Sequence, residues 1–125
     1  MRMLSLITAA LVMVTGCSVA SAAQLYEGLW ASTEKDCTDE DGVNRMSIEG
    51  GNRLYWYETR CRASEIKPNG ARAWKMRMSC EGEGMKYKSS PRVSIAADGK
   101  LVMDNGPVGE GKRQTYVRCE LPNKR

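Results

Sequence analysis

The sequence predicts an all-β fold, a small antiparallel barrel or sandwich of about seven or eight short strands held by two disulfides. Short runs in which apolar and polar residues alternate recur along the chain, closed by turn signals such as Gly50-Gly51-Asn52 and Asp98-Gly99. No long stretch has the period of a helix, and no heptad repeat is present. Four of the five cysteines lie beyond residue 22, an even number that suits a disulfide framework.

Residues 1–22 have the pattern of a secretory signal peptide. The apolar run at 4–14 is too short to span a bilayer as a helix, which needs about 20 residues. Ala20-Ser21-Ala22 fits a cleavage site that would leave residues 23–125 as a single β domain. Val14-Thr15-Gly16-Cys17 also resembles a bacterial lipobox, which would make Cys17 a lipidated N-terminus. Both interpretations predict an exported protein that is periplasmic or secreted, and the second adds a lipid anchor at Cys17. A third interpretation is that residues 1–22 remain uncleaved as a buried helix.

The first strands are expected on either side of an acidic loop. Residues 26–32 form the opening strand, in which Gly28 allows another backbone to approach closely. Residues 34–42 form the acidic loop, and residues 45–48 form a short strand that ends at a Gly-Gly turn.

The aromatic-rich run Arg53–Arg60 is expected to form one strand. Its period of two puts Leu54 and Trp56 on one face and Tyr55 and Tyr57 on the other. Exposed aromatic side chains often anchor interfaces, so Tyr55 and Tyr57 are candidate binding residues.

A hairpin of residues 72–80 and 85–88 follows a turn at Pro68-Asn69-Gly70. Its apolar residues alternate with charged ones, as a sheet with one wet face requires. The basic residues on the outward face are Lys75, Arg77, Lys86 and Lys88. These four form a second candidate binding surface, although outward positions are commonly charged without any further role.

The chain is expected to close with three more strands. Residues 93–95 and 101–103 flank the hairpin signal Asp98-Gly99. The last strand is expected at 113–119, with one side carrying Thr115, Val117 and Cys119.

The cysteines Cys37, Cys61, Cys80 and Cys119 predict two disulfides in an exported chain. Four cysteines allow three pairings, which the sequence does not distinguish. We expect Cys37–Cys61 and Cys80–Cys119, because each pair would join neighbouring segments. No C-x-x-C pair and no histidine is present in the sequence, so a zinc site is not expected. The acidic loop does not match an EF-hand, which leaves a loose cation site there as a minor alternative to a solvated loop. We therefore expect no metal site and no cofactor.

The opening of the mature chain resembles that of small calycin-type barrels. Gly28-x-Trp30, with Cys37 and Cys61 following 24 residues apart, is most similar to the periplasmic metalloprotease-inhibitor family of Gram-negative bacteria. The resemblance covers only the first part of the mature chain, and the second cysteine pair departs from it. It implies a small barrel with a disulfide across its opening strands, and inhibition through the free N-terminal residues, here Ala23, Gln24 and Leu25.

No catalytic residues are expected. The sequence has no histidine to act as a base and no G-x-S-x-G motif. The carboxylates Glu81 and Glu83 lie in a Gly-interleaved turn, where solvation would leave their pKa untuned for acid–base work. An enzyme is therefore the least favoured function.

The charge distribution favours a binding protein. The chain carries a net charge of +4, yet residues 27–49 hold seven acidic and two basic residues, whereas residues 72–92 hold six basic and two acidic ones. The basic segment suits an acidic protein or an anionic component of the cell envelope, and export argues against nucleic acid. The predicted function is thus a small exported binding protein, with inhibition of another macromolecule as one form of it. The alternative is a structural or lipid-associated envelope protein, without a transmembrane segment in the mature chain.

Overall fold

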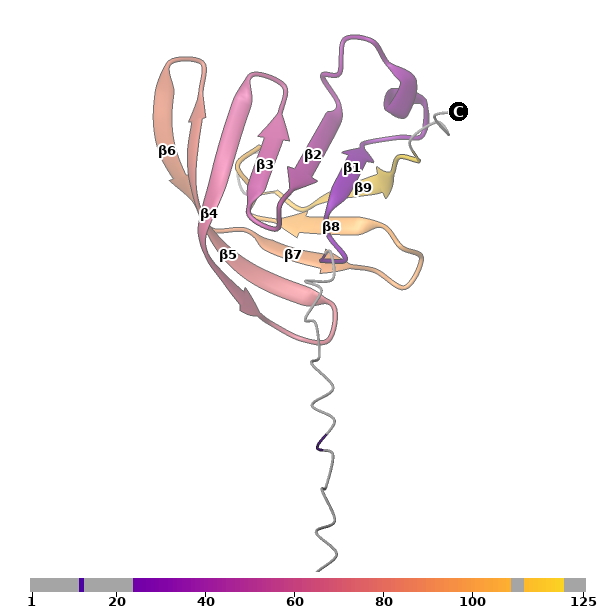
Figure 1. The fold of residues 1–125 in the computed structure, drawn as a ribbon. Helices are drawn as coiled ribbons and strands as arrows, with labels where there is room; N and C mark the ends of the chain where they lie inside the picture. The colour runs from indigo at the N-terminus through magenta and orange to yellow at the C-terminus, as the bar shows by residue number, and fades with distance from the viewer. Residues whose placement is uncertain (1–11, 13–23, 109–111, 121–125) are drawn as a thin grey trace, which may run out of the picture.

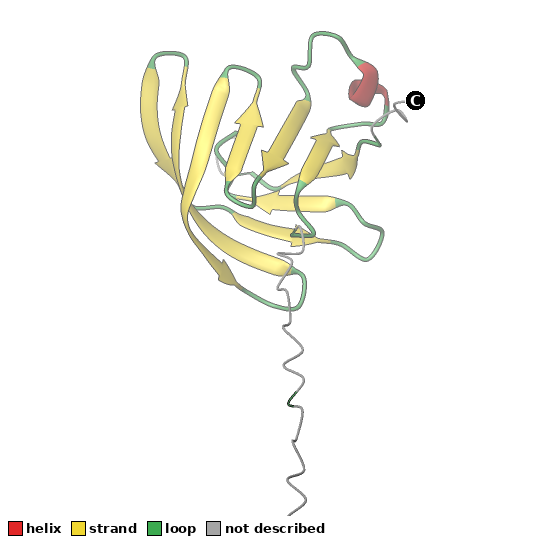
Figure 2. Cartoon of the chain, viewed as in Figure 1, coloured by secondary structure: helices red, strands yellow, loops and turns green. Residues whose placement is uncertain are grey.

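Strands dominate the computed structural model, which describes residues 12, 24–108 and 112–120 (Figures 1 and 2). The expected signal segment, apart from Val12, and its alternative lipidation site Cys17 lie outside the described residues. The strands and the single 3₁₀ helix of the described part are β1 (Gly28–Ala31), η1 (Lys35–Thr38), β2 (Arg45–Glu49), β3 (Arg53–Trp56), β4 (Thr59–Pro68), β5 (Ala73–Gly82), β6 (Met85–Ser89), β7 (Arg92–Ile95), β8 (Leu101–Asp104) and β9 (Gln114–Arg118).

Eight strands close into an antiparallel barrel, which confirms the predicted fold class. They pair in the order β4-β3-β2-β1-β9-β8-β7-β5, and the pairing of β4 with β5 closes the ring. Strand β6 is an extra strand, because β5 pairs with β7 over Ala73–Lys75 and with β6 over Met78–Gly82. Strand β6 therefore stands beside the barrel wall, at the left of Figure 1.

The run Arg53–Arg60 is a hairpin rather than the single strand expected from its composition. Strand β3 ends at Trp56 and pairs with Thr59 at the start of β4, which leaves Tyr57 and Glu58 as the turn. Glu58 has a φ of 35°, in the left-handed region that favours glycine. The turn thus lacks the glycine that would have marked it in the sequence, and the ten-residue strand β4 covers residues 61–67, for which no strand was expected.

The barrel interior is filled by side chains of alternating positions. In β5, Met76, Met78 and Cys80 are buried while Lys75, Arg77 and Ser79 are exposed, as predicted. Trp30, Leu54, Val93 and Leu101 are completely buried in the core. Tyr26 contacts Trp74, and Trp56 contacts Tyr116, both in edge-on ring geometry.

The residue of β9 that faces the core is not one of those grouped with Cys119 in the sequence-based prediction. Tyr116 is buried opposite Leu101 on β8, whereas Thr115 is exposed and Val117 is half-buried. The expectation grouped Thr115 and Val117 with Cys119, but Cys119 lies beyond the end of β9. Its position therefore does not continue the alternation of the strand.

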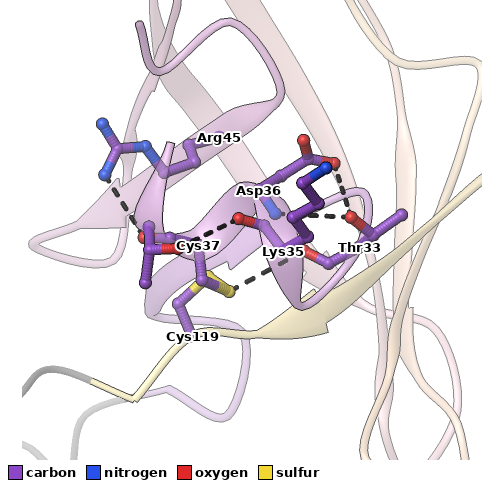
Figure 3. The surroundings of a disulfide bond; sticks show 7 residues. Thr33, Lys35, Asp36, Cys37, Arg45 and Cys119 are labelled. Carbon is purple, nitrogen blue, oxygen red and sulfur yellow. Dashed lines mark hydrogen bonds between the residues drawn. A yellow bond between two sulfur atoms is a disulfide. The ribbon is translucent and has the colours of Figure 1, made fainter. Parts of the chain in front are cut away.

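The two disulfides join Cys37 to Cys119 and Cys61 to Cys80, so the expected pairing is wrong although the expected number is right. Cys61 and Cys80 are direct partners in the β4–β5 ladder. Cys37 lies in η1 after β1, and Cys119 follows β9, the strand that pairs with β1 (Figure 3). The fold pairs the first strand with the last, so Cys37 and Cys119 lie close together although they are far apart in the sequence. The expected pairing was wrong because it joined cysteines that are close in the sequence.

One side chain fastens the start of the described chain to the barrel. The guanidinium of Arg118 lies 4.2 Å from the ring centroid of Trp30. It also donates hydrogen bonds to the carbonyl oxygens of Glu27 (2.8 Å) and Leu25 (2.6 Å). A Cβ at Gly28, where φ is 133°, would lie 2.8 Å from Arg118 Nη1, so glycine leaves room for this contact.

None of the helices in the described part of the chain has the length and apolar character needed to cross a membrane.

Candidate binding groove

The outer face of β3–β6 carries an open groove of about 700 Å³ where β6 leaves the barrel wall. Most of its lining side chains point away from the core and are at least partly exposed. The lining residues are Arg53, Tyr55, Arg60, Cys61, Arg62, Ser79, Cys80, Glu81, Lys86, Tyr87 and Lys88. We refer to this surface as the basic groove.

Strand register arranges the exposed side chains of the basic groove in two rows that cross the strands. Direct partners in an antiparallel ladder share a face, with their Cβ atoms about 5 Å apart. The first row is Tyr55, Arg60, Glu81 and Lys86. The second row is Arg53, Arg62, Ser79 and Lys88. Between them, Leu54, Cys61, Cys80 and Tyr87 form the row that faces the core.

Positive charge dominates the basic groove. Its lining contains five basic residues and one carboxylate, that of Glu81. Arg60 Nη2 lies 3.8 Å from Glu81 Oε1, and both side chains are more than half exposed. An exposed pair at this distance contributes only about 0–1 kcal/mol. In the described part of the chain, no carboxylate lies within ion-pair distance of Arg53, Arg62, Lys86 or Lys88.

The extra strand β6 pairs with β5 along one edge and is also held by side-chain contacts to the core and to the turn after β8. The half-buried ring of Tyr87 packs against the core, and its hydroxyl donates to the carbonyl oxygen of Pro107 at 3.3 Å. Ser89 Oγ donates to the carbonyl oxygen of Asn105, whose side-chain amide donates to that of Ser90. These hydrogen bonds fix β6, the strand that carries Lys86 and Lys88 into the groove, to the turn after β8.

The structure separates the four basic residues predicted to form one binding face. Lys86 and Lys88 line the basic groove, whereas Lys75 and Arg77 lie farther along β5 in a second hollow of about 400 Å³. There the carboxylate of Glu65 lies 2.8 Å from Lys67 Nζ and 3.3 Å from Arg77 Nε. The hydrogen bond and charge of Lys67, with the charge of Arg77, lower the pKa of Glu65. The carboxylate of this hollow thus pairs with two of its four basic residues, whereas that of the basic groove pairs with one of five.

The two candidate tyrosines also have different surroundings. Tyr55 is half-buried and lines the basic groove, with Arg60 as its partner in the β3–β4 ladder. Tyr57 is 49% exposed in the β3–β4 turn and does not line the groove. Met85, at the start of β6, is 64% exposed.

Sequence reasoning did not identify Arg53, Arg60 and Arg62 as site residues. The signal for two of them was present, since Arg60-Cys61-Arg62 alternates basic and apolar residues as a half-buried strand does. That strand was missed because the preceding turn has no glycine, so the arginines were not assigned to an outward face.

The described residues contain no group of three or more cysteines, aspartates and glutamates arranged to hold a metal ion. Glu81 and Glu83, the only carboxylates considered for catalysis, are both exposed. Glu83 lies in the β5–β6 turn with a φ of 50°. The geometry of the groove thus suits ionic and hydrogen-bonding contacts with a ligand.

Comparison with known proteins returned no match, either to a family model or to a curated protein or solved structure.

Proposed function

We propose that this chain is an exported, non-catalytic binding protein that holds an anionic partner in the basic groove. The observation that carries the proposal is the groove itself, in which four of the five basic residues have no carboxylate within ion-pair distance among the described residues. Unpaired cations gathered in a concave surface create a positive potential that attracts anions and accelerates their association.

Export is supported by the two disulfides and by the signal pattern of residues 1–22. Disulfides persist in the periplasm and outside the cell, and they are rare in reducing compartments. A non-catalytic role is supported by the absence of histidine from the sequence and by the exposure of Glu81 and Glu83.

Inhibition of a protease through the N-terminal residues is less favoured than binding in the groove. Leu25 is half-exposed, but its carbonyl oxygen accepts a hydrogen bond from Arg118. Gln24 accepts another from the amide of Glu27, so the chain is fastened close to its predicted mature start. The Cys37–Cys61 bridge that contributed to the resemblance to metalloprotease inhibitors is replaced by Cys37–Cys119.

A lipid-associated envelope role is the second candidate, favoured by two exposed apolar side chains near the groove. Tyr57 and Met85 lie at the β3–β4 and β5–β6 hairpin tips. These tips are adjacent, because Gly82 pairs with Thr59 on one side and Met85 on the other. Exposed apolar groups beside cations suit an anionic lipid surface.

The test is a capture experiment with the oxidised protein on a support and solubilised cell envelope as the source of partners. The groove variant is Arg62→Glu/Lys88→Glu, and the matched control is Lys75→Glu/Arg77→Glu, which makes the same charge change outside the groove. We expect the groove variant to lose its partners and the control to retain them. The loss should be largest at low salt, because exposed charges are screened over about 8 Å at physiological ionic strength. Equal loss in both variants, or retention in both, would contradict the proposal.

A further inference from the structure

The two rows of the basic groove differ in chemistry. The second row places Ser79 between Arg62 and Lys88, with Arg53 beyond Arg62; the carboxylate of Glu49, the ladder partner of Arg53 on β2, lies outside the groove lining. The first row has Glu81 at the corresponding central position, with the ring of Tyr55 at its end. The first row also holds Arg60 and Lys86, so both rows carry positive charge, but the second row, without a carboxylate in the groove, is the better suited to an anion.

The second row has the donors that a tetrahedral oxyanion requires. Strands β4 and β6 flank β5, so the backbones that carry Arg62 and Lys88 are about 10 Å apart. Both side chains are long enough to converge above Ser79, whose hydroxyl is a further donor. A guanidinium fork matches the oxygens of a phosphate or sulfate, and an ammonium adds a point charge. Both cations are exposed, and neither has a carboxylate partner in the described part of the chain.

The first row has groups that contact a neutral polar ring. The half-buried ring of Tyr55 offers a flat apolar surface with a polar edge. The exposed carboxylate of Glu81 accepts hydrogen bonds, which sugar hydroxyls can donate. That carboxylate would repel a second anion, so a chain with a negative charge at every unit fits the groove poorly.

We infer that the basic groove recognises a sugar unit that bears a phosphate or sulfate ester. The ester lies over the second row, and the sugar ring lies against Tyr55 with its hydroxyls toward Glu81. This inference rests on the proposed binding function and specifies its ligand. A groove of about 700 Å³ has the size of a small-ligand site, so it would hold one or a few sugar units of a longer glycan.

The experiment measures the affinity of the purified, oxidised protein for four immobilised probes. They are a dextran sulfated at a minority of its sugar units, a mannan phosphorylated at a minority of its units, an unmodified dextran, and polyglutamate of similar length. The sulfated and phosphorylated probes should bind, and their ratio distinguishes the two sources of the ester. Unmodified dextran and polyglutamate should bind at least about tenfold more weakly, because each lacks one half of the recognised group.

Variants assign the binding to the two rows. Arg62→Ala/Lys88→Ala should weaken glycan binding about 10-fold or more, whereas the charge-matched control Lys75→Ala/Arg77→Ala should change it less than about twofold. Tyr55→Ala should weaken glycan binding about 2- to 10-fold and leave polyglutamate binding unchanged. Glu81→Gln should strengthen the binding of polyglutamate. Thermal unfolding of each variant verifies that the fold is retained.

The outcomes separate this inference from the proposed function. If polyglutamate binds as tightly as the ester-bearing glycans and Tyr55→Ala has no effect, the groove is a general anion surface and the sugar inference is wrong. If no probe binds, the inference is also wrong, and the envelope capture still decides the proposed function. If the glycans bind but Arg62→Ala/Lys88→Ala leaves that binding intact, both the sugar inference and the proposed role of the basic groove are wrong.

Discussion

Trp30 is the largest side chain that the fold buries completely, and its indole N–H is satisfied by the carbonyl oxygen of Tyr26 at 2.9 Å. We expect Trp30→Ala to lower the free energy of unfolding by about 3–5 kcal/mol, as truncation of a buried aromatic side chain does. Urea unfolding followed by circular dichroism measures the change. An unaltered midpoint would mean that Trp30 does not contribute to the core.

Two buried phenols make stability depend on pH in the alkaline range. Burial raises the pKa of Tyr116, and burial together with the charge of Glu27 raises that of Tyr26. The unfolded chain loses these protons near pH 10, whereas the folded chain keeps them to higher pH. Above pH 10 the folded state therefore binds more protons, so the free energy of unfolding decreases as pH rises.

Urea unfolding between pH 8 and 11 tests this dependence. Tyr116→Phe should show a shallower decrease than the wild type, because it removes one of the two phenols while keeping the ring that contacts Trp56. A control, Tyr57→Phe, removes an exposed phenol and should follow the wild-type curve. Identical slopes for the wild type and Tyr116→Phe would contradict the assignment.

At the scale of elements, Arg118 joins β9 to the turn before β1. It makes two charge-assisted hydrogen bonds and one cation–π contact, which truncation would remove together. Arg118→Met should therefore lower the free energy of unfolding by about 1.5–3 kcal/mol. Arg113→Met, which removes an exposed ion pair with Asp104 just before the same strand, should lower the free energy of unfolding much less. Thermal unfolding of the two variants compares them, and equal effects would show that the Arg118 contacts contribute nothing specific.

The strands that alternate strictly were predictable, and the turns without glycine were not. In β5 every second residue from Met76 to Cys80 is buried, so the alternation of apolar and charged residues predicted both the strand and its two faces. The β3–β4 turn was hidden because Glu58 takes a left-handed conformation that sequence normally signals with glycine. An unexpected turn there also concealed the ten residues of β4.

The candidate site was predictable only in parts, because strand register is a long-range property. Lys86, Lys88 and Tyr55 were singled out by their outward positions, but they come from strands that are not adjacent in the sheet. Strands β4 and β5 lie between them, and β4 contributes Arg60 and Arg62 to the same surface. The second half of the expected patch, Lys75 and Arg77, was lost because β5 is long enough to pair with β6 and β7 in turn.

At the scale of the whole molecule, the two disulfides constrain the chain very differently. Cys37–Cys119 encloses 82 residues of sequence separation and fastens η1 to the end of β9. Figure 3 shows this bridge beside Arg45, which donates a hydrogen bond to the carbonyl oxygen of Cys37. Cys61–Cys80 spans a separation of only 19 residues within one strand pair. The Cys37–Cys119 bridge therefore joins the first and last parts of the barrel, whereas the Cys61–Cys80 bridge reinforces a local ladder.

This pairing predicts two linked peptides in a non-reducing digest of the oxidised protein. One should contain Cys37 with Cys119, and the other Cys61 with Cys80. Alkylation before digestion should label none of these four cysteines. Recovery of a Cys37–Cys61 peptide, or of four labelled thiols, would contradict the arrangement of the barrel.

The same difference predicts the order in which removal of the bridges destabilises the fold. In the loop-entropy account, a bridge closing 82 residues restricts the unfolded chain by about 4.5 kcal/mol, and one closing 19 residues by about 3.2 kcal/mol. Cys37→Ala/Cys119→Ala should therefore lower the free energy of unfolding by more than Cys61→Ala/Cys80→Ala does, by about 1 kcal/mol. Urea unfolding of both double variants beside the wild type measures this. Core packing opposes the predicted order of stabilities. Cys61 and Cys80 are both buried, so their truncation removes core contacts in addition to the bridge. If Cys61→Ala/Cys80→Ala were nevertheless the less stable variant, packing within the β4–β5 ladder, rather than closure of the chain, would dominate the contribution of the bridges.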